Sequence, residues 1–264
     1  MLLYQNSSSY ENAAMGTDWV NNLLEEHCVG QYCFTVDADE LFCINTEKYA
    51  SLNGLIDEME VTQTNVVPVT LLDMYPKETN DNYKKGNSFL THSPFFDDFN
   101  ETFYETRGGV YKSFVFMLGG VRQRVLGITV CINKFPFFKY DFAPLGVAPG
   151  YHFFQTDGKV QLQSDKISLF REAGVLLHFK FLKPNLGEFY QTRVNESLSE
   201  EVAFDGARRA AQTWVNENEQ YARTFAHNSS VNFYDHQYSR LLNEVSNLSS
   251  FFSMNKESKS KYIV

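Results

Sequence analysis

The chain has 264 residues, with 32 Asp and Glu against 23 Lys and Arg, so its formal net charge is -9. This balance excludes the basic surface of nucleic-acid-binding proteins, and an acidic protein that handles anionic ligands needs a metal ion or a few placed cations. Because there is no apolar membrane span, no secretory leader and no metal-finger spacing among the four cysteines, we expect a cytoplasmic protein, with peripheral membrane contact left open.

The first predicted elements are a helix and a strand that ends on acidic residues. Apolar residues recur at helical spacing over 11–27, and an apolar run over 32–36 predicts a buried strand. Three carboxylates follow at once, on Asp37, Asp39 and Glu40. Two acids separated by one residue can hold a divalent cation, because hard cations prefer carboxylate oxygens. The alternative is a solvated acidic turn, since short Asp-x-Asp strings are common by chance.

A second predicted strand also ends on an acid. Helical spacing over 47–60 predicts a crossover helix, and the apolar run over 66–72 predicts a strand that leads into Asp73. The alternation of helices and strands is typical of an α/β fold. Because parallel strands bring their carboxyl ends to one edge of a sheet, we expect Asp73 to lie near the first acidic group.

The next charged segment combines glycines with arginines. A glycine pair precedes Arg122 and Arg124, where an exposed backbone and two guanidinium groups can receive an anion. The alternative is a glycine-bearing hairpin with solvated arginines.

The last strand-like run, over 174–184, contains His178 and Lys180. A lone His in such a run is more often a hydrogen-bonded core residue than a ligand. Helical patterns over 187–224 and 241–248 then lead to a Lys- and Ser-rich tail.

Several short sequence blocks occur in an order that is informative. The blocks are Trp19-Val-Asn-Asn-Leu-Leu, Gly30-Gln-Tyr-Cys, Val36-Asp-Ala-Asp-Glu-Leu-Phe, Leu71-Leu-Asp-Met-Tyr-Pro, Gly119-Gly-Val-Arg-Gln-Arg and Leu176-Leu-His-Phe-Lys-Phe. Their order resembles glycosyltransferases of the family-2-like group, which have the GT-A fold. The resemblance implies an α/β, GT-A-like domain over 1–225, with a mixed, mainly parallel sheet flanked by helices. A helical C-terminal extension and tail would follow over 226–264.

The resemblance also implies an activity. Such enzymes transfer a sugar from a nucleotide-sugar donor to a glycan or another hydroxyl acceptor, so a donor and a glycan-type acceptor are the expected partners. Mn²⁺ or Mg²⁺ bridges the donor diphosphate, because a cation stabilises the negative charge that grows on the leaving group.

The resemblance assigns residues to this donor site. Asp37 would lie near the donor ribose or the metal, Asp39 would ligate the metal, and His178 would be a further ligand. Three cations are candidates to neutralise the diphosphate. They are Arg122, Arg124 and Lys180.

An inverting enzyme also needs a carboxylate base for the acceptor hydroxyl. Asp97 and Asp98 are the first choice, because Phe95 and Phe96 beside them suggest a sugar-stacking platform. Asp73 is the second choice. Each has a structural alternative, since Asp73 suits a turn and Asp97 suits a helix N-cap.

The chain departs from the family at its beginning. Only 36 residues precede Asp37, and the opening strand of the family, with its Arg-Asn-Glu type signature, is not found. We therefore expect an N-terminally incomplete domain, in which the pocket for the nucleotide base is missing. One alternative function is a non-catalytic carbohydrate- or partner-binding remnant. A metal-dependent phosphoesterase is a further alternative, although it would need more His and Asp ligands than the six histidines supply.

Overall fold

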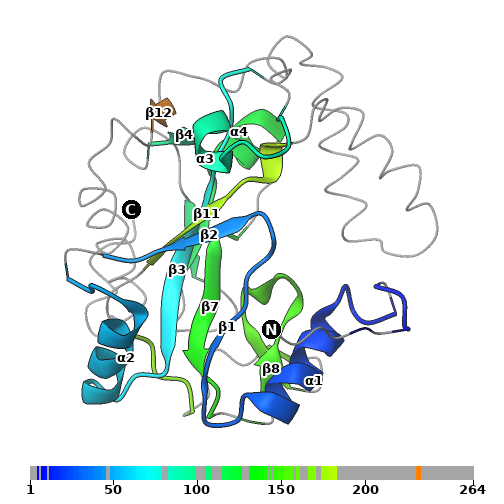
Figure 1. Cartoon of the computed structure of the whole chain (residues 1–264), viewed down its shortest axis with the longest axis vertical. Coiled ribbons are helices and arrows are strands. Elements are labelled where there is room, and N and C mark those ends of the chain that lie inside the picture. The colour runs from blue at the N-terminus through cyan, green and yellow to red at the C-terminus, as the bar shows by residue number, and fades with distance from the viewer. Residues whose placement is uncertain are drawn as a thin grey trace.

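A five-stranded sheet organises the part of the chain that the computed structural model describes (Figure 1). The described residues are 5, 7–10, 12–45, 48–78, 83–98, 105–108, 115–126, 131–141, 143, 145–156, 159–160, 166–170, 174–182 and 230–232. In spatial order the strands are β1 (Tyr32–Phe34), β7 (Asn133–Lys139), β3 (Val66–Asp73), β11 (Gly174–His178) and β2 (Glu40–Cys43).

The sheet is mixed, and most of its strand pairs are antiparallel. β3 and β11 run parallel, whereas the β1–β7, β7–β3 and β11–β2 pairs are antiparallel. The expectation of a mixed α/β fold is confirmed, but the expectation of a mainly parallel sheet is wrong. The physical reason is that β1 and β2 each pair with a segment about a hundred residues or more away, and periodicity within one segment does not reveal the direction of such a partner. β1 and β2 are the two edge strands of the sheet, and they pair with β7 and β11 respectively.

The centre of the sheet is fully buried. All eight residues of β3 are buried, and the run is rich in Val and Leu, as expected for a strand that is covered on both faces. β11 is buried throughout as well. Its Gly174 allows the close approach of the neighbouring strands, because a Cβ there would lie 2.8 Å from the Phe42 ring and 3.0 Å from the Cys43 carbonyl oxygen. Burial of each large apolar side chain contributes about 1.5–3 kcal/mol to stability.

The sheet is curled, so that its two edges approach each other. The rings of Phe34 on β1 and Phe42 on β2 have centroids 5.1 Å apart, although these strands lie at opposite ends of the strand order. Both rings also contact Phe137 of β7, at 6.1 and 6.2 Å. The acidic segment that connects β1 to β2 therefore crosses the end of the sheet from one edge to the other.

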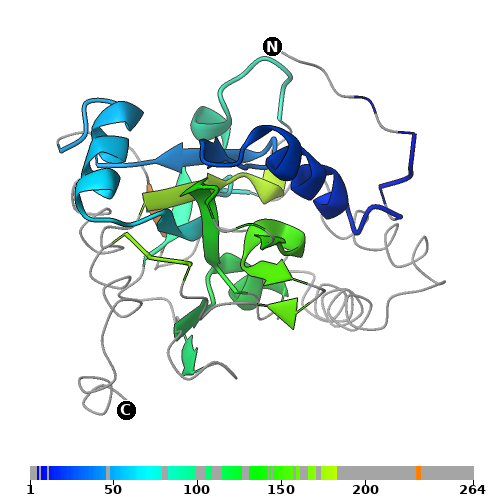
Figure 2. The ribbon, with the colours of Figure 1, turned by 90° about the horizontal axis from the view of Figure 1, so that it is seen from below.

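Helices flank this sheet on two sides (Figure 2). α1 covers Thr17–His27 and α2 covers Leu52–Val61, so both predicted helices exist but begin later than expected. α1 begins at Thr17 because the three residues before it have positive φ. α2 begins after Ser51, whose Oγ accepts a hydrogen bond from the Gly54 amide at 3.4 Å.

The remaining elements are short. The helical ones are α3 (Phe89–His92), α4 (Val121–Leu126), η1 (Pro149–Tyr151) and η2 (Lys180–Leu182). β4 (Phe95–Asp97) pairs with β12 (Ser230–Asn232), and β5 (Glu105–Gly108) pairs with β6 (Val115–Leu118). β8 (Gly146–Val147), β9 (Phe154–Thr156) and β10 (Lys159–Val160) form a separate small sheet.

α1 is anchored to the small sheet by one side chain. Asn21 Nδ2 donates to the Val147 carbonyl oxygen at 3.1 Å, and the Val147 amide donates to Asn21 Oδ1 at 2.7 Å. Gly146 is needed beside this contact, because a Cβ there would lie 2.6 Å from the Asn21 side chain. α1 is thereby fixed against β8.

The predicted C-terminal helices and the expected domain boundary near residue 225 lie outside the described residues. None of the described helices is both long and apolar enough to cross a membrane.

Candidate functional site

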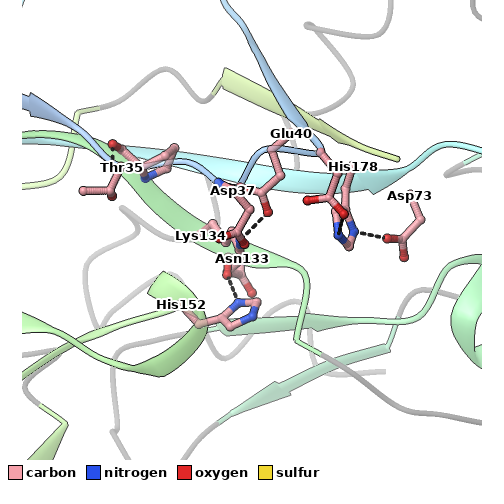
Figure 3. A network of polar contacts seen from close by, with 10 residues as sticks. Thr35, Asp37, Glu40, Asp73, Asn133, Lys134, His152 and His178 are labelled. Carbon is pink, nitrogen blue, oxygen red and sulfur yellow. Dashed lines mark hydrogen bonds and ion pairs between the residues drawn. The ribbon is translucent and has the colours of Figure 1, made fainter. Parts of the chain in front are cut away.

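Charged residues from four strands meet at one end of the curled sheet. Glu40 begins β2, Lys134 lies near the start of β7, and Asp73 and His178 end β3 and β11. In the strand register His178 stands opposite both Glu40 and Asp73. Figure 3 shows these side chains close together. The expectation that Asp73 lies near the first acidic group is therefore confirmed, with an antiparallel strand supplying part of the cluster.

Asp73 is the buried centre of this cluster. Its Oδ1 lies 2.6 Å from His178 Nδ1, and its Oδ2 accepts a hydrogen bond from Arg122 Nε at 2.6 Å. Burial alone would raise the pKa of Asp73, but the Arg122 charge and the His178 hydrogen bond outweigh it and hold this pKa well below its usual range. Asp73 is therefore an ionised acceptor that orients two neighbours.

The contact with Asp73 fixes the tautomer of His178. A carboxylate only accepts hydrogen bonds, so His178 Nδ1 carries the proton and Nε2 of the neutral ring carries a lone pair. This Nε2 lies 3.7 Å from Asp39 Oδ2. Two electron-rich atoms face each other there, which is favourable only with a proton or a cation between them. A divalent cation about 2.1 Å from each atom would fit the gap, and a carboxylate behind a metal-binding His is a common arrangement.

Lys134 holds the other two acids of the string. Its buried ammonium group pairs with Glu40 Oε1 and lies 3.3 Å from Asp37 Oδ2. Glu40 Oε2 in turn accepts the Asp37 amide at 3.1 Å. The Asp-Ala-Asp string is therefore divided, with Asp37 turned to Lys134 and Asp39 turned to His178. In the described part of the chain, no three His, Cys, Asp or Glu side chains are arranged to hold a metal ion.

Arg122 offers donors that the protein does not use. It is the second residue of α4, which forms directly after the glycine pair, so this segment is a helix rather than the alternative hairpin. Arg122 is 8% exposed, and its Nη2 has no hydrogen-bond partner among the described residues. Since an unpaired buried guanidinium nitrogen is costly, this group is suited to receive an anion.

His152 is a site residue that the sequence did not reveal. Its Nδ1 donates to the Asn133 carbonyl oxygen at 2.6 Å, so its Nε2 carries the lone pair (Figure 3). Burial, together with the charges of Lys134 and Arg122, lowers the pKa of His152 to about 4, so the ring is neutral at physiological pH. Lys134 and Glu40 were also missed as site residues. Their signals were a lysine within an apolar run and the last acid of the string, which are too common to identify a site.

Several of these side chains line a pocket of about 1040 Å³, whereas Asp39 and Asp73 lie outside its lining. One part of the lining, called the floor below, consists of the charged residues Asp37, Glu40, Arg122, Lys134 and Lys180 together with His178. The rest of the lining, called the wall below, comes mainly from α1, the segment before it and the turn over 149–153. The volume lies at the upper end of the range of small-molecule sites, which is about 300–1,000 Å³.

The predicted residues Asp97 and Arg124 lie outside the pocket lining. Asp97 is 2% exposed; Arg124 Nη2 donates to its Oδ1 at 2.7 Å and Arg124 Nε to its Oδ2 at 3.1 Å. The Tyr75 hydroxyl also donates to Asp97, at 2.5 Å. This ion pair uses the carboxylate and guanidinium groups for each other. Asp98 follows directly after β4 and does not line the pocket either.

The segment expected to be a sugar platform is part of the core instead. Phe96 is 1% exposed and belongs to a buried cluster with Leu177 and Phe179. Phe95 stacks on Tyr75, with ring centroids 6.4 Å apart. The expectation of an exposed stacking surface at these two rings is therefore wrong, because β4 covers the ends of β3 and β11.

Comparisons with models of protein families, with curated proteins and with solved structures found no match to this chain. The resemblance to family-2-like glycosyltransferases therefore depends on the short sequence blocks. The chemistry of the site depends on the contacts of Asp39, Asp73, Arg122 and His178.

Proposed function

We propose that this protein is a GT-A-like glycosyltransferase, which binds a nucleotide sugar together with Mn²⁺ or Mg²⁺ and transfers the sugar to a hydroxyl acceptor. One observation carries the proposal. A single buried carboxylate, Asp73, orients both His178, whose Nε2 faces Asp39, and Arg122, whose Nη2 has no partner among the described residues. These contacts support a cation position between Asp39 and His178 and an anion position at Arg122, and His178 and Arg122 both line the pocket.

The two positions match the two parts of a metal diphosphate. Asp39 and His178 would hold the cation, which when bound neutralises the diphosphate that leaves. Arg122 would donate to a phosphate oxygen, and Lys180 on the pocket floor adds a second positive charge. Two protein ligands leave most coordination positions to the donor and to water, as is usual for Mg²⁺ with phosphates.

The remaining floor residues hold the acidic segment in place. Lys134 binds both Asp37 and Glu40, which fixes the turn that presents Asp39. Lys134 is buried, so its charge must remain paired. Asp37, whose side chain is half exposed at the pocket edge, is left in position to meet a hydroxyl group of the donor.

The second candidate is a carbohydrate-binding remnant without catalysis. It is favoured by the state of the predicted bases, because Asp73 and Asp97 are both engaged in buried ion pairs. A carboxylate held by an arginine is a poor acceptor for the proton of a hydroxyl group. The two candidates differ in whether bound nucleotide sugar is turned over.

The experiment is calorimetry of the full chain with UDP and GDP, with and without Mn²⁺. We expect binding that depends on Mn²⁺, and we expect Asp39→Asn to remove that dependence while Asp57→Asn, on the exposed face of α2, keeps it. Failure of both nucleotides to bind with Mn²⁺ would sink the enzyme proposal. Release of UDP or GDP from the matching nucleotide sugars then separates an enzyme from a remnant.

A further inference from the structure

Aromatic side chains dominate the wall of the pocket, which is the lining from α1, the segment before it and the turn over 149–153. Tyr10 and Trp19 line it from the N-terminal side, and Tyr151 and Phe153 line it from the turn after β8. Tyr10 is 59% exposed, and the other three rings are half-buried. None of the residues assigned above to the donor belongs to this wall.

The backbone that carries the wall is strained. Four non-glycine residues in the described part have positive φ, and three of them belong to the two segments that form the wall. They are Ala14 at 47°, Met15 at 56° and Tyr151 at 57°. Such conformations cost about 1–3 kcal/mol each and cluster at ligand-binding positions, where the surrounding structure maintains them.

The rings of the wall are held in fixed positions. Trp19 Nε1 donates to Ser8 Oγ at 2.8 Å, and the Tyr10 ring meets the indole edge to face with centroids 6.2 Å apart. Tyr10 lies against Gly16, where a Cβ would be 3.0 Å from the ring. The ammonium group of Lys134 lies 5.7 Å from the centre of the Tyr151 ring. The wall is therefore pre-organised, which reduces the entropy lost on binding.

We propose that this wall is a saccharide subsite, on which an uncharged pyranose of the acceptor glycan stacks against Trp19 and Tyr151. The proposal rests on the proposed function, because it assigns the second substrate to the same pocket. A pyranose has an apolar face and a polar edge, and the wall offers the complement, with aromatic rings beside the polar side chains of Asn22 and Glu26.

Charge and space both favour this occupant. Among the described lining residues, Glu26 is the one that brings a formal charge to the wall, and this charge is negative. An anionic sugar is therefore disfavoured on the wall, whereas the phosphates of the donor are favoured on the floor. A pocket of about 1040 Å³ has room for both substrates. Lys134 of the floor lies 5.7 Å from the centre of the Tyr151 ring, so a sugar on the wall would lie close to the donor residues.

The test uses the fluorescence of Trp19 in the full chain. The sequence has two tryptophans, so a Trp214→Phe background makes Trp19 the reporter. Neutral oligosaccharides are first selected on a glycan array with the full chain, alone and with Mn²⁺ and UDP. We expect the selected saccharides to change the emission of Trp19. We expect Tyr151→Ala to weaken their binding about threefold to tenfold, as for the loss of one aromatic contact.

The matched control is Phe34→Leu, which changes an exposed ring on β1 that does not line the pocket and should leave saccharide affinity unchanged. The subsite is overturned if no neutral glycan on the array binds under either condition. It is also overturned if uridine or guanosine changes the emission and the saccharides do not, since the wall would then hold a nucleobase.

The two proposals fail separately in this design. Binding of UDP with Mn²⁺ but of no saccharide removes the subsite and leaves the donor site. Binding of a saccharide with no binding of UDP or GDP removes the donor site and leaves the wall as a carbohydrate-binding surface.

Discussion

Two buried aspartates with similar partners serve different purposes in this molecule. Asp73 and Asp97 each pair with an arginine of α4, and these arginines are two residues apart. Around Asp97, two of the three guanidinium nitrogens of Arg124 (Nε and Nη2) and the Tyr75 hydroxyl donate to the carboxylate, and the Tyr75 hydroxyl lies 2.8 Å from Ser230 Oγ. Around Asp73, Arg122 keeps Nη2 without a partner among the described residues and lines a pocket.

The difference teaches how to separate a structural ion pair from a functional one. Both aspartates are almost fully buried, so burial does not distinguish them. The distinguishing feature is the number of hydrogen bonds that are made, because Asp97 accepts from two Arg124 nitrogens and the Tyr75 hydroxyl, whereas beside Asp73 the buried Arg122 Nη2 has no partner among the described residues. The first pattern stabilises the junction of β4 and β12, and the second is suited to a ligand.

The largest expected effect is a loss of stability when the Asp97–Arg124 pair is broken. Asp97→Asn removes the charge of a buried carboxylate that pairs with the half-buried guanidinium group of Arg124, so we expect the free energy of unfolding to fall by about 3–5 kcal/mol. Urea denaturation followed by circular dichroism measures it. Asp57→Asn, an exposed carboxylate on α2, should change stability by no more than about 0.5 kcal/mol. A loss below about 1 kcal/mol for Asp97→Asn would show that this pair is not a structural anchor.

An intermediate effect is expected at the Asp73–Arg122 pair, and it should appear as a loss of nucleotide affinity. Arg122→Lys keeps one positive charge but cannot reach both Asp73 and a ligand. We expect the affinity for UDP with Mn²⁺ to fall about ten- to a hundredfold, which corresponds to about 1.5–3 kcal/mol. Arg124→Lys is the matched control, with lower stability and unchanged affinity. Equal losses of affinity in the two variants would remove the distinction between the pairs.

The smallest effect concerns pH. The pKa of Asp73 is held below its unfolded value of about 4, so the native state gains stability that is complete above this pH and is lost as the pH falls below it. One such group contributes a slope of at most about 1.4 kcal/mol per pH unit. Asp73→Asn should be less stable at pH 7 and should lose less on acidification, in urea titrations between pH 6 and pH 3. Parallel curves for the variant and the parent protein would contradict this assignment.

The sequence predicted the elements that depend on local periodicity. The strand over 66–73 was expected nearly as it is, and the helix over 52–61 was expected although it begins five residues later than the prediction, because regular burial is visible in a single segment. The approach of Asp73 to the first acidic group was also foreseen, since both follow apolar strands, whereas His178 was assigned to this place by the family resemblance. The directions of the strands were not foreseen, because they depend on which segments, far apart in the sequence, pair with each other.

The rest of the site is invisible in any one segment. Lys134 and His152 acquire their roles from contacts with residues far away in the chain, such as the 94-residue separation between Lys134 and Glu40. The prediction of a base at Asp97 and of a sugar platform at Phe96 missed such distant contacts as well, because β4 pairs with a strand from residues 230–232. The prediction of a donor site stays a prediction, and the geometry now states which atoms would form it.

The pairing of the two edge strands has a consequence for folding. β1 and β2 follow each other in the sequence, but their partners β7 and β11 come about a hundred residues later or more, so their contacts are non-local and slow to form. During synthesis both strands must wait, unpaired and rich in apolar residues, until the chain through His178 has emerged. Asp39 and His178 can face each other only after that last strand is inserted. The pocket is therefore among the last features to form, and its ligands are expected to act on the final step of folding.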